Sequence, residues 1–524
     1  MAAIFGLFAS ERATARPAYS LPKLQALHER LQSILEADEQ TEAAVEVIRE
    51  MTEALLWGEQ NDHNENFFDF FCEKSILADF VRILGRPVPK TVKVQLLQSL
   101  SMLIQNIRRP TSLYYLFSNN YVNQLIATQF DWSDEEILGY YISFLKSLAL
   151  RLNEETIKFF FQERSQQFPL FTEAVRFFSH HDQMVRTSVR TLTLRVFNVK
   201  DEAMQSFVLK ISRPYFRHLA EHLCLLWRTL DESKGQPNAL DEANAEQQDL
   251  VMYISDVLEM KNANLSRIVV KMVLDHACYP MLLESLAAED QSLLSWRTAL
   301  FLLQEFFQTS QQRELVEPLA TSLLATPGAA SAPARSSTSS RSTLKEAVDV
   351  WEPFKAEDPE ESVGVTVNAF SELYRPKILG HLLKEEPLLT AALLRSCLGL
   401  GISNLLEQGL LIEAGLLPPL PGHAVTTPAA PAAPPLEVLH RAAAALEDHS
   451  SLNMVAIQAL ARLCLDVAFT PEARSLSGSK DWREKPLEAI QRGLRSAAQQ
   501  VRSFIHHLGD GFLDLFGEAW EQEH

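Results

Sequence analysis

The fold class is indicated most clearly by one stretch of the sequence, Lys93-Val-Gln-Leu-Leu-Gln-Ser-Leu-Ser-Met-Leu-Ile-Gln-Asn-Ile-Arg-Arg-Pro110. Its apolar residues recur every three or four positions, which places them along one stripe of an α-helix. They are Val94, Leu97, Leu100, Ile104 and Ile107. Two arginines and a proline follow, so positive charge lies at the helix C-terminus and a helix-breaking residue comes directly after it. The pattern predicts a helix over 93–107.

The same helical spacing continues from Leu24 to about Leu324, with no sustained strand-like alternation. A second informative run opens at Asp182 and places Val185, Val189, Leu192 and Val196 on one face. This run resembles the second helix of HEAT or armadillo repeats, in which aliphatic residues alternate with arginines. A lone helix of this kind cannot cover its apolar stripe, but stacked helices can. We therefore expect an all-α, HEAT/armadillo-like helical solenoid.

Several polar residues mark the expected helix starts. Ser133-Asp-Glu-Glu136 has the form of a capping box, in which Ser133 accepts a backbone N–H and Glu136 reaches back to it. Asn153 and Asp182 are further expected N-caps. Another helix is expected to begin near Thr111.

Two stretches interrupt the helical pattern. Residues 326–345 are rich in Ser, Ala and Pro and are predicted to be a disordered linker, and 417–435 are predicted to be a semi-stiff Pro/Ala linker. The other predicted segments are a flexible N-terminus at 1–20, a helical array at 21–325, a helical segment at 346–416 and a C-terminal helical segment at 436–520. Either these linkers loop out of one continuous array, or they tether separate domains.

Composition excludes some classes of protein. A net charge of −19 argues against broad nucleic-acid binding, which calls for a basic surface. The cysteines are far apart and form no C-x-x-C pair, so we expect reduced, buried core residues of a cytosolic protein. No apolar run reaches the roughly 18 residues that span a bilayer, so any membrane association is expected to be peripheral. The cysteines are Cys72, Cys224, Cys278, Cys397 and Cys464.

No motif of a catalytic or metal site is present in the sequence. There is no phosphate-binding G-x-x-x-x-G-K-[ST], no H-E-x-x-H and no G-x-S-x-G. The histidine pairs His180-His181 and His506-His507 are adjacent, and adjacent side chains diverge by about 100° on a helix, so neither pair forms a metal site alone. We therefore expect no catalytic residue, cofactor, metal or small-molecule substrate.

Aromatic residues provide the candidate interaction sites. At helical spacing most of them are expected in the core, but a remainder can form an exposed patch, and such patches are favoured at interfaces. Gly511 to Trp520 form a short amphipathic element, expected either to cap the last helices or to contact a partner or membrane. The candidate residues are Tyr114, Tyr115 and Tyr121, and at the C-terminus Phe512, Leu515, Phe516 and Trp520.

Long motifs in the first 200 residues resemble the FPL domain. They include Leu56-Trp-Gly-Glu-Gln-Asn-Asp62 with Phe68-Asp-Phe-Phe71, and Thr111-Ser-Leu-Tyr-Tyr-Leu-Phe-Ser-Asn-Asn-Tyr-Val-Asn123. Tyr140-Tyr-Ile-Ser-Phe-Leu-Lys146 and the tripeptide Phe168-Pro-Leu170 also match. The resemblance points to the family of C-type lectin domain family sixteen member A, whose insect member is called endosomal maturation defective.

This resemblance implies a non-enzymatic peripheral scaffold in the cytoplasm, on endosomal, lysosomal, vacuolar or Golgi membranes. Members of the family that the chain resembles act in membrane traffic and autophagy, including mitophagy. The implied partners are tethering or sorting complexes, Rab GTPase machinery and a RING-type ubiquitin ligase. A component of, or adaptor for, a ubiquitin ligase controlling mitophagy is the alternative function, and a lipid-binding peripheral protein is a third. The family offers no established catalytic residues to carry over.

Overall fold

The computed structural model describes most of the chain up to Leu324 and parts of the remainder. The described residues are 19–37, 41–60, 66–118, 120–233, 235–287, 293–324, 378–379, 386–417, 437–447, 452–468, 470, 488–493, 495–496 and 498–499. Within these ranges every named secondary-structure element is a helix, and strand-type pairing is limited to an isolated bridge between Gln162 and Gln167. The predicted all-α fold class is confirmed. The predicted flexible N-terminus and both predicted linkers lie almost entirely outside the described residues.

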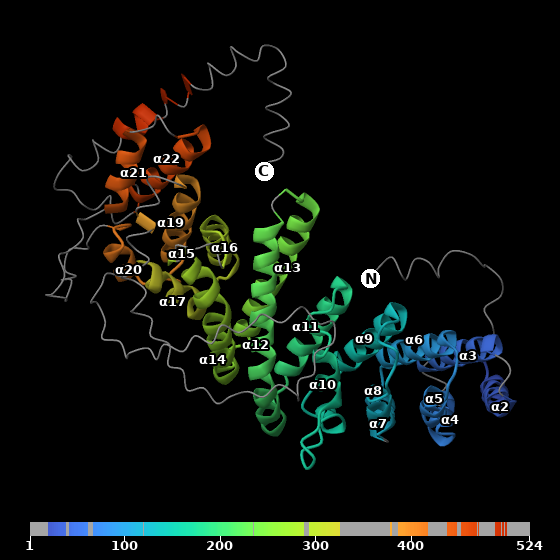
Figure 1. Cartoon of the computed structure of the whole chain (residues 1–524). Coiled ribbons are helices and arrows are strands. Elements are labelled where there is room, and N and C mark those ends of the chain that lie inside the picture. Colours follow the sequence, from blue (N-terminus) through green and yellow to red (C-terminus); the bar gives the residue numbers. More distant parts are fainter. Residues whose placement is uncertain are drawn as a thin grey trace, which may run out of the picture. The chain divides into compact units, whose positions relative to one another are not determined.

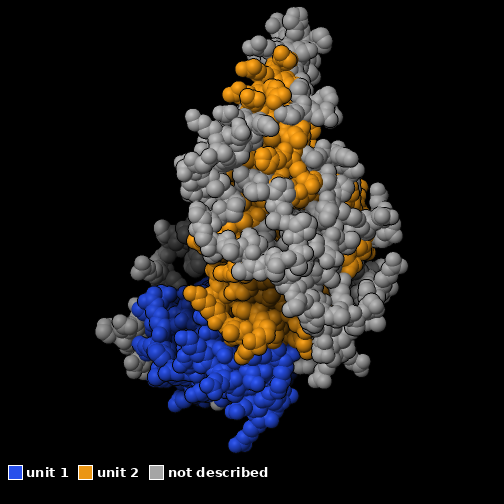
Figure 2. Space-filling model, turned by 90° about the vertical axis from the view of Figure 1, so that its left-hand side faces the viewer, with its two compact units in different colours: residues 1–211, 348–356 blue, residues 212–347, 357–524 orange. Residues whose placement is uncertain are grey.

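The chain divides into two compact units. Unit 1 comprises residues 1–211 and 348–356, and unit 2 comprises 212–347 and 357–524 (Figure 2). The boundary falls within one long helix, α12 (Glu202–Glu232).

Unit 1 repeats one helical arrangement, a long helix followed by two short ones. A single helix, α2 (Leu21–Ala37), precedes the repeats, and α11 (Gln183–Phe197) follows them. The first group is α3 (Thr41–Gln60), α4 (Asn66–Glu73) and α5 (Ile76–Leu84); the second is α6 (Lys90–Asn106), α7 (Pro110–Ser118) and α8 (Tyr121–Ile126); the third is α9 (Glu135–Ala149), the 3₁₀ turn η1 (Thr156–Phe159) and α10 (Pro169–Val175).

Equivalent helices of successive groups stack in rows. The long helices α3, α6, α9 and α11 pack side by side, α4 packs on α7 and α7 on η1, and α5 packs on α8 and α8 on α10 (Figure 1). Each group therefore buries its apolar faces against its immediate neighbours, which is the defining property of a solenoid. The repeating unit is a whole group of three helices, and the short helices differ in length from group to group. The sequence therefore shows helical spacing but no regular repeat length.

The long-helix row contains the predicted apolar stripes. On α6, Leu97, Leu100 and Ile104 are buried and Val94 is half-buried, and Ile107 is buried directly after the helix. The helix ends at Asn106, one residue before the predicted end, and Ile107 separates it from the arginines and proline that predicted that end. On α11 the four predicted positions are all buried: Val185, Val189, Leu192 and Val196.

The N-cap predictions have mixed outcomes. Asp182 caps α11 as predicted, because its carboxylate accepts the backbone N–H groups of Met184 and Val185. Ser133 does not cap α9; Asp134 does, and Ser133 instead donates to the Asp131 carboxylate. A carboxylate one residue later competes successfully for the free N–H groups, since it carries the charge that the helix dipole favours. Asn153 accepts two backbone N–H groups but starts a 3₁₀ turn rather than an α-helix.

Unit 2 has a comparable row of longer helices, in which α13 packs on α16, α16 on α19 and α19 on α22. Between them lie shorter elements, including a π-helix, η2, that continues α14 without a break. The bounds are α13 (Pro237–Glu259), α14 (Ala263–Val273), η2 (Leu274–Leu283), α15 (Glu284–Ala287), α16 (Trp296–Thr309), α17 (Arg313–Leu324), α19 (Pro387–Ile402), α20 (Gln408–Glu413), α21 (Glu437–Glu447) and α22 (Met454–Ala468).

Polar contacts fix the antiparallel pairing of α12 and α13 within unit 2. The hydroxyls of Tyr215 and Tyr253 lie 3.0 Å apart, and His222 Nε2 lies 2.8 Å from Glu246 Oε1. One step forward along α12 is thus matched by one step backward along α13. α12 is a single helix of 31 residues with Pro214 inside it.

Candidate interaction surface

Two of the candidate tyrosines, Tyr114 and Tyr115, are adjacent on α7 and tie its row together. The Tyr115 hydroxyl donates a 2.6 Å hydrogen bond to the carbonyl of Cys72, in α4 of the preceding group. The Tyr114 hydroxyl donates to the Glu155 carboxylate, directly before η1 of the following group. Each side chain is half-buried. The two tyrosines therefore connect α7 to opposite neighbours, and each presents part of its ring to solvent.

The third tyrosine, Tyr121, occupies the first position of α8. It follows Asn120, whose φ of 57° lies in the left-handed region that asparagine tolerates, and so the chain turns sharply between α7 and α8. Tyr121 is half-buried. The four candidate residues of the C-terminal element lie outside the described residues. Whether any of these seven residues contacts a partner stays a prediction.

Hydrogen bonding at Tyr114 also affects its acidity. The Glu155 carboxylate accepts the phenolic proton and would repel a phenolate, so the pKa of Tyr114 is raised. Tyr19, whose hydroxyl donates to Glu53, shows a related effect: burial and that hydrogen bond raise its pKa to about 12. Both phenols are therefore neutral hydrogen-bond donors at physiological pH.

The motif Trp57-Gly58-Glu59 at the end of α3 has a structural role. Glu59 is 5% exposed, and its Oε1 accepts the backbone N–H groups of Arg108 and Arg109 at 3.0 and 2.9 Å. These groups belong to the junction between α6 and α7, where helix ends leave donors without intrahelical partners. Beside it, a Cβ added to Gly58 would lie 2.7 Å from Cβ of Phe67. The first group of helices thus holds the second through this motif.

Arg151 holds the same junction from the other side. Located just after α9, its guanidinium donates to the carbonyls of Ile104, Gln105 and Ile107 at 2.9, 2.6 and 3.0 Å. These carbonyls include acceptors left free at the C-terminus of α6. The end of α6 therefore contacts a carboxylate from the preceding group and a guanidinium from the following one.

Two of the arginines that alternate with the aliphatic residues of α11 are buried. Arg186 is 7% exposed and donates to the carbonyls of His180 and His181, while Arg190 is 8% exposed. His180 is itself buried, and its Nδ1 accepts the backbone N–H of Asp182, so it helps to form the start of α11. In this part of α11, the arginines that alternate with valines are therefore buried as well.

The cysteine thiols are poor nucleophiles. Cys224, Cys278, Cys397 and Cys464 are buried, as predicted, and Cys72 is half-buried. Burial raises the pKa of Cys72, Cys224, Cys397 and Cys464 to about 12, and that of Cys278 well above its usual value. Since the thiolate is the reactive form, these groups are protonated and unreactive at neutral pH. In the part of the chain that the structure describes, no three His, Cys, Asp or Glu side chains are grouped to hold a metal ion.

The region that contains these inter-group contacts matches a known family. Residues 48–197 match the profile of the FPL family, described as an uncharacterised conserved protein. These residues resemble an FPL domain. The match runs from within α3 to the end of α11, and so it covers most of the three repeated groups together with the closing helix. The resemblance seen in the sequence motifs is confirmed.

Curated relatives extend the similarity beyond the FPL domain. Human Protein CLEC16A is 39% identical over 325 residues, which cover 59% of this chain and 31% of that protein. Protein CLEC16A homolog of Drosophila melanogaster is 40% identical over 46% of this chain and 23% of its own length. Protein TRANSPARENT TESTA 9 of Arabidopsis thaliana is 34% identical over 59% of this chain and 38% of its own. The match thus spans between 23% and 38% of the length of these relatives.

Among solved structures, a designed armadillo repeat protein in complex with a (KR)4 peptide aligns with 54% of this chain and 99% of its own. The identity is 13% and the TM-score 0.32. The solenoid fold described above is established by the helix packing itself. No helix among the described residues is both long enough and apolar enough to cross a bilayer.

Proposed function

We propose that this chain is a non-enzymatic scaffold in membrane traffic and autophagy, bound peripherally to endosomal, lysosomal, vacuolar or Golgi membranes. The observation that carries the proposal is the role of the FPL motif residues. Glu59 and Tyr115, which belong to those motifs, join one helical group to the next, and Arg151, which lies outside them, does the same. A motif that maintains an extended stack is what a docking surface requires, because partner proteins bind along the rows.

The chemistry of the described side chains supports a role without catalysis. A thiol-dependent ubiquitin ligase needs a reactive cysteine, and each thiol here has a raised pKa from burial. The adaptor form of the alternative, in which the chain presents a separate ligase to its target, is compatible with the same scaffold. Tethering or sorting complexes and Rab GTPase machinery are the partners that we propose first.

Proximity labelling of the full chain in its native cell tests the proposal. The expected result is enrichment of tethering or sorting proteins of one endosomal, lysosomal, vacuolar or Golgi membrane. Carbonate extraction of the same membranes should release the chain. Enrichment of nuclear or nucleic-acid-binding proteins, or a turnover reaction by the purified chain, would overturn it.

A surface variant locates the binding site within the FPL domain. Tyr121→Ser changes a half-buried residue at the start of α8, and Tyr140→Ser changes a half-buried residue on α9, in the long-helix row. If partners dock on the α8 side, the first variant should lose labelled proteins while retaining its helical circular-dichroism spectrum and melting temperature. Tyr140→Ser is the matched control and should retain those proteins. Equal loss from both variants would assign the effect to unfolding.

A further inference from the structure

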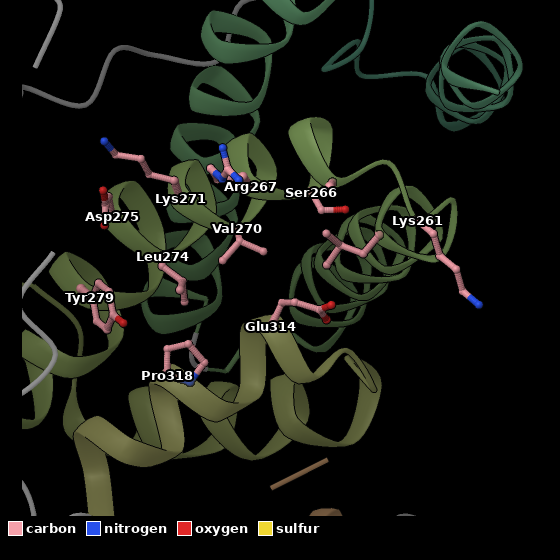
Figure 3. A pocket seen from close by; sticks show the side chains of 12 residues that line it. Lys261, Ser266, Arg267, Val270, Lys271, Leu274, Asp275, Tyr279, Glu314 and Pro318 are labelled. Atoms are coloured by element: carbon pink, nitrogen blue, oxygen red, sulfur yellow. The ribbon is translucent and has the colours of Figure 1, made fainter. Parts of the chain in front are cut away.

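Unit 2 contains an open cavity of about 700 Å³ that is lined by α14 and η2 on one side and by α17 on the other (Figure 3). Val270 and Leu274 face Pro318 of α17 across it, and Leu258 at the end of α13 adds to the apolar lining. Val270 and Pro318 are half-buried, so part of this apolar surface is open to water. An apolar, concave surface of this volume accommodates several large side chains.

The cavity is elongated along α14 and η2. Its lining residues there recur every three to five positions, as expected for one face of an α-helix that widens into a π-helix. They are Ala263, Ser266, Arg267, Val270, Lys271, Leu274, Asp275 and Tyr279. From Ala263 to Tyr279 this face is at most about 24 Å long, which is the length of roughly four turns of a second helix. The cavity therefore has the proportions of a groove that binds a helix.

The cavity lies where the backbone departs from α-helical geometry. The helix continues from α14 into the ten-residue π-helix η2, which supplies Leu274, Asp275 and Tyr279 to the lining. π-Helices are rare, mostly confined to a single turn, and frequent at functional sites. The irregular wall is thus a second observation, independent of the cavity's volume, that favours a binding role.

Positive charge borders the apolar lining on the α14 side. Lys261 and Arg267 are exposed and Lys271 is half-buried, and none of the three forms an ion pair with another described residue. By contrast, Arg313 at the start of α17 is paired with Glu317. In a chain whose net charge is −19, these three cations are available to the carboxylates of a partner.

Negative charge in the lining lies at other places. Asp275 belongs to η2, at the far end of the elongated face, and Glu314 belongs to the opposite wall on α17. The two long walls therefore differ in sign, since α14 contributes cations and α17 contributes a carboxylate. A partner with acidic groups on both sides would meet repulsion from Glu314, so the lining favours acidic groups on one side only.

We propose that this cavity binds an amphipathic α-helix of a partner protein, about four turns long, with acidic side chains along one flank of its apolar face. The apolar face covers Val270 and Pro318, and the acidic flank faces Arg267 and Lys271. The other flank faces Glu314 and is neutral or basic. A membrane surface fits less well, because bilayer binding buries an apolar face that can enter the lipid, whereas this apolar surface is recessed. This inference is independent of the proposed function in membrane traffic, since it concerns only the chemistry that the cavity recognises.

Two fluorescein-labelled synthetic peptides of about 16 residues, or roughly four helical turns, test the proposal on the full chain. Both form a helix with leucine and phenylalanine on one face, and one flank of that face carries glutamate in the first peptide and lysine in the second. Fluorescence anisotropy should show at least about tenfold tighter binding of the glutamate peptide. The net charge of −19 attracts the lysine peptide at long range, so this order requires the local cations. Equal affinities, the reverse order, or no binding of either peptide would overturn the proposal.

Photo-crosslinking locates the bound peptide. Benzoylphenylalanine replaces one phenylalanine of the glutamate peptide, the complex is irradiated, and the linked fragments are identified by mass spectrometry. The expected products join the peptide to residues 258–279 or 314–318. Products on another surface would overturn the proposal. Binding of phosphatidylserine vesicles through the same cations, with the peptide linked elsewhere, would assign them to a membrane surface and would equally overturn it.

Charge reversal tests the role of the α14 cations. Arg267→Glu with Lys271→Glu should weaken binding of the glutamate peptide by at least about fivefold, because two attractive charge contacts become repulsive. Lys158→Glu with Lys200→Glu, two exposed cations of unit 1, changes the net charge equally and should leave the affinity unchanged. Circular dichroism and melting temperature establish that both double variants are folded. The same affinity in both would overturn the assignment of the acidic flank to α14.

Filling the cavity tests its apolar part. Ser266 is a small, half-buried lining residue of α14, whereas Asn264 on the same helix is exposed and does not line the cavity. Ser266→Trp should therefore weaken binding of the glutamate peptide by at least about tenfold, because the indole occupies the space of the peptide's apolar side chains. Asn264→Trp is the matched control and should retain the affinity. Full binding by a folded Ser266→Trp chain would show that the peptide does not enter the cavity, and would overturn the proposal.

Discussion

The Oε1 atom of Glu59 lies 2.9 Å from the backbone nitrogen of Arg109, a residue 50 positions later in the chain. One carboxylate oxygen accepts two consecutive backbone N–H groups, at Arg108 and Arg109, and so fixes the direction in which the chain leaves α6. The stacking of the second group on the first depends on that direction. An acidic side chain within a conspicuous sequence motif therefore acts on the fold and not on a substrate.

Replacing Glu59 with alanine should lower the free energy of unfolding by about 2 kcal/mol, because charge-assisted bonds to buried or part-buried donors are lost. Glu59→Gln should lose less, since the amide oxygen still accepts a hydrogen bond. Urea unfolding followed by circular dichroism measures both. Gln60→Ala, on the exposed neighbouring position, is the control and should have little effect. If Glu59→Ala matched that control, the junction would not depend on the carboxylate.

Gly58 and Gly139 offer a matched pair within long helices. A Cβ at Gly58 would lie 2.7 Å from Cβ and 2.8 Å from Cγ of Phe67, whereas a Cβ at Gly139 meets nothing within 4 Å. Gly58→Ala should therefore destabilise by about 1–3 kcal/mol through overpacking. Gly139→Ala should stabilise by about 0.5–1 kcal/mol, because alanine is the better helix former. Changes of the same sign in the two variants would contradict this reading of the α3–α4 contact.

The fold class was accessible from the sequence for a physical reason. Stripes such as Val185, Val189, Leu192 and Val196 follow helical spacing whatever the helix packs against, and all four are buried. The division into one long and two short helices was not accessible, since it depends on contacts such as Glu59 with Arg109 that join residues far apart in sequence. The π-helix was missed for a similar reason, because residues 274–283 have ordinary apolar composition and no local signal of wider turns.

The candidate site was predicted less well than the fold. Aromatic residues in a run identify a packed region, but the sequence does not tell which hydroxyl will find an acceptor in a neighbouring group. Tyr114 and Tyr115 thus turned out to be links between groups, with only part of each ring exposed. Arg151 has no motif around it that indicates three carbonyl acceptors. The cavity lined by α14, η2 and α17 depends on α17, about 40 residues after α14, and so it had no sequence signal either.

Arg151 should be intolerant even of lysine. An ammonium group cannot reproduce the fork that reaches the carbonyls of Ile104, Gln105 and Ile107 at once. Arg151→Lys should therefore cost about 1–2 kcal/mol, and Arg151→Met more, by urea unfolding. Lys158→Gln, an exposed cation in the same group, should change stability little. If Arg151→Lys were as stable as the parent chain, one hydrogen bond would be enough to hold the end of α6.

The two tyrosines of α7 should separate in their effects on stability. Tyr115→Phe loses a bond to a backbone carbonyl that cannot move away, so the expected loss is about 1 kcal/mol. Tyr114→Phe loses a solvent-exposed bond to the exposed carboxylate of Glu155 and should leave the unfolding midpoint unchanged. Denaturation curves of both variants under one buffer condition give the comparison. A larger loss in Tyr114→Phe would show that the contact with Glu155 holds the third group in place.

Alkaline pH should destabilise the fold through its thiols. Burial raises the pKa of Cys224, Cys397 and Cys464 to about 12, while a thiol in the unfolded chain has a pKa of about 8.5. Above that value the unfolded chain releases protons that the folded chain retains, so stability is fully present below about pH 8.5 and declines as pH rises towards 12.

Labelling with a thiol reagent tests whether the folded structure shields these thiols. At pH values below its pKa, a solvent-accessible cysteine reacts about tenfold faster for each unit by which the pH rises, because its thiolate fraction rises tenfold. In the native chain, the four buried thiols should react far more slowly than a free thiol, because they react only when the structure opens, while in urea all five cysteines should react at the rate of a free thiol. Rapid native labelling of any of the four would show an accessible thiolate, and would reopen thiol chemistry for this chain.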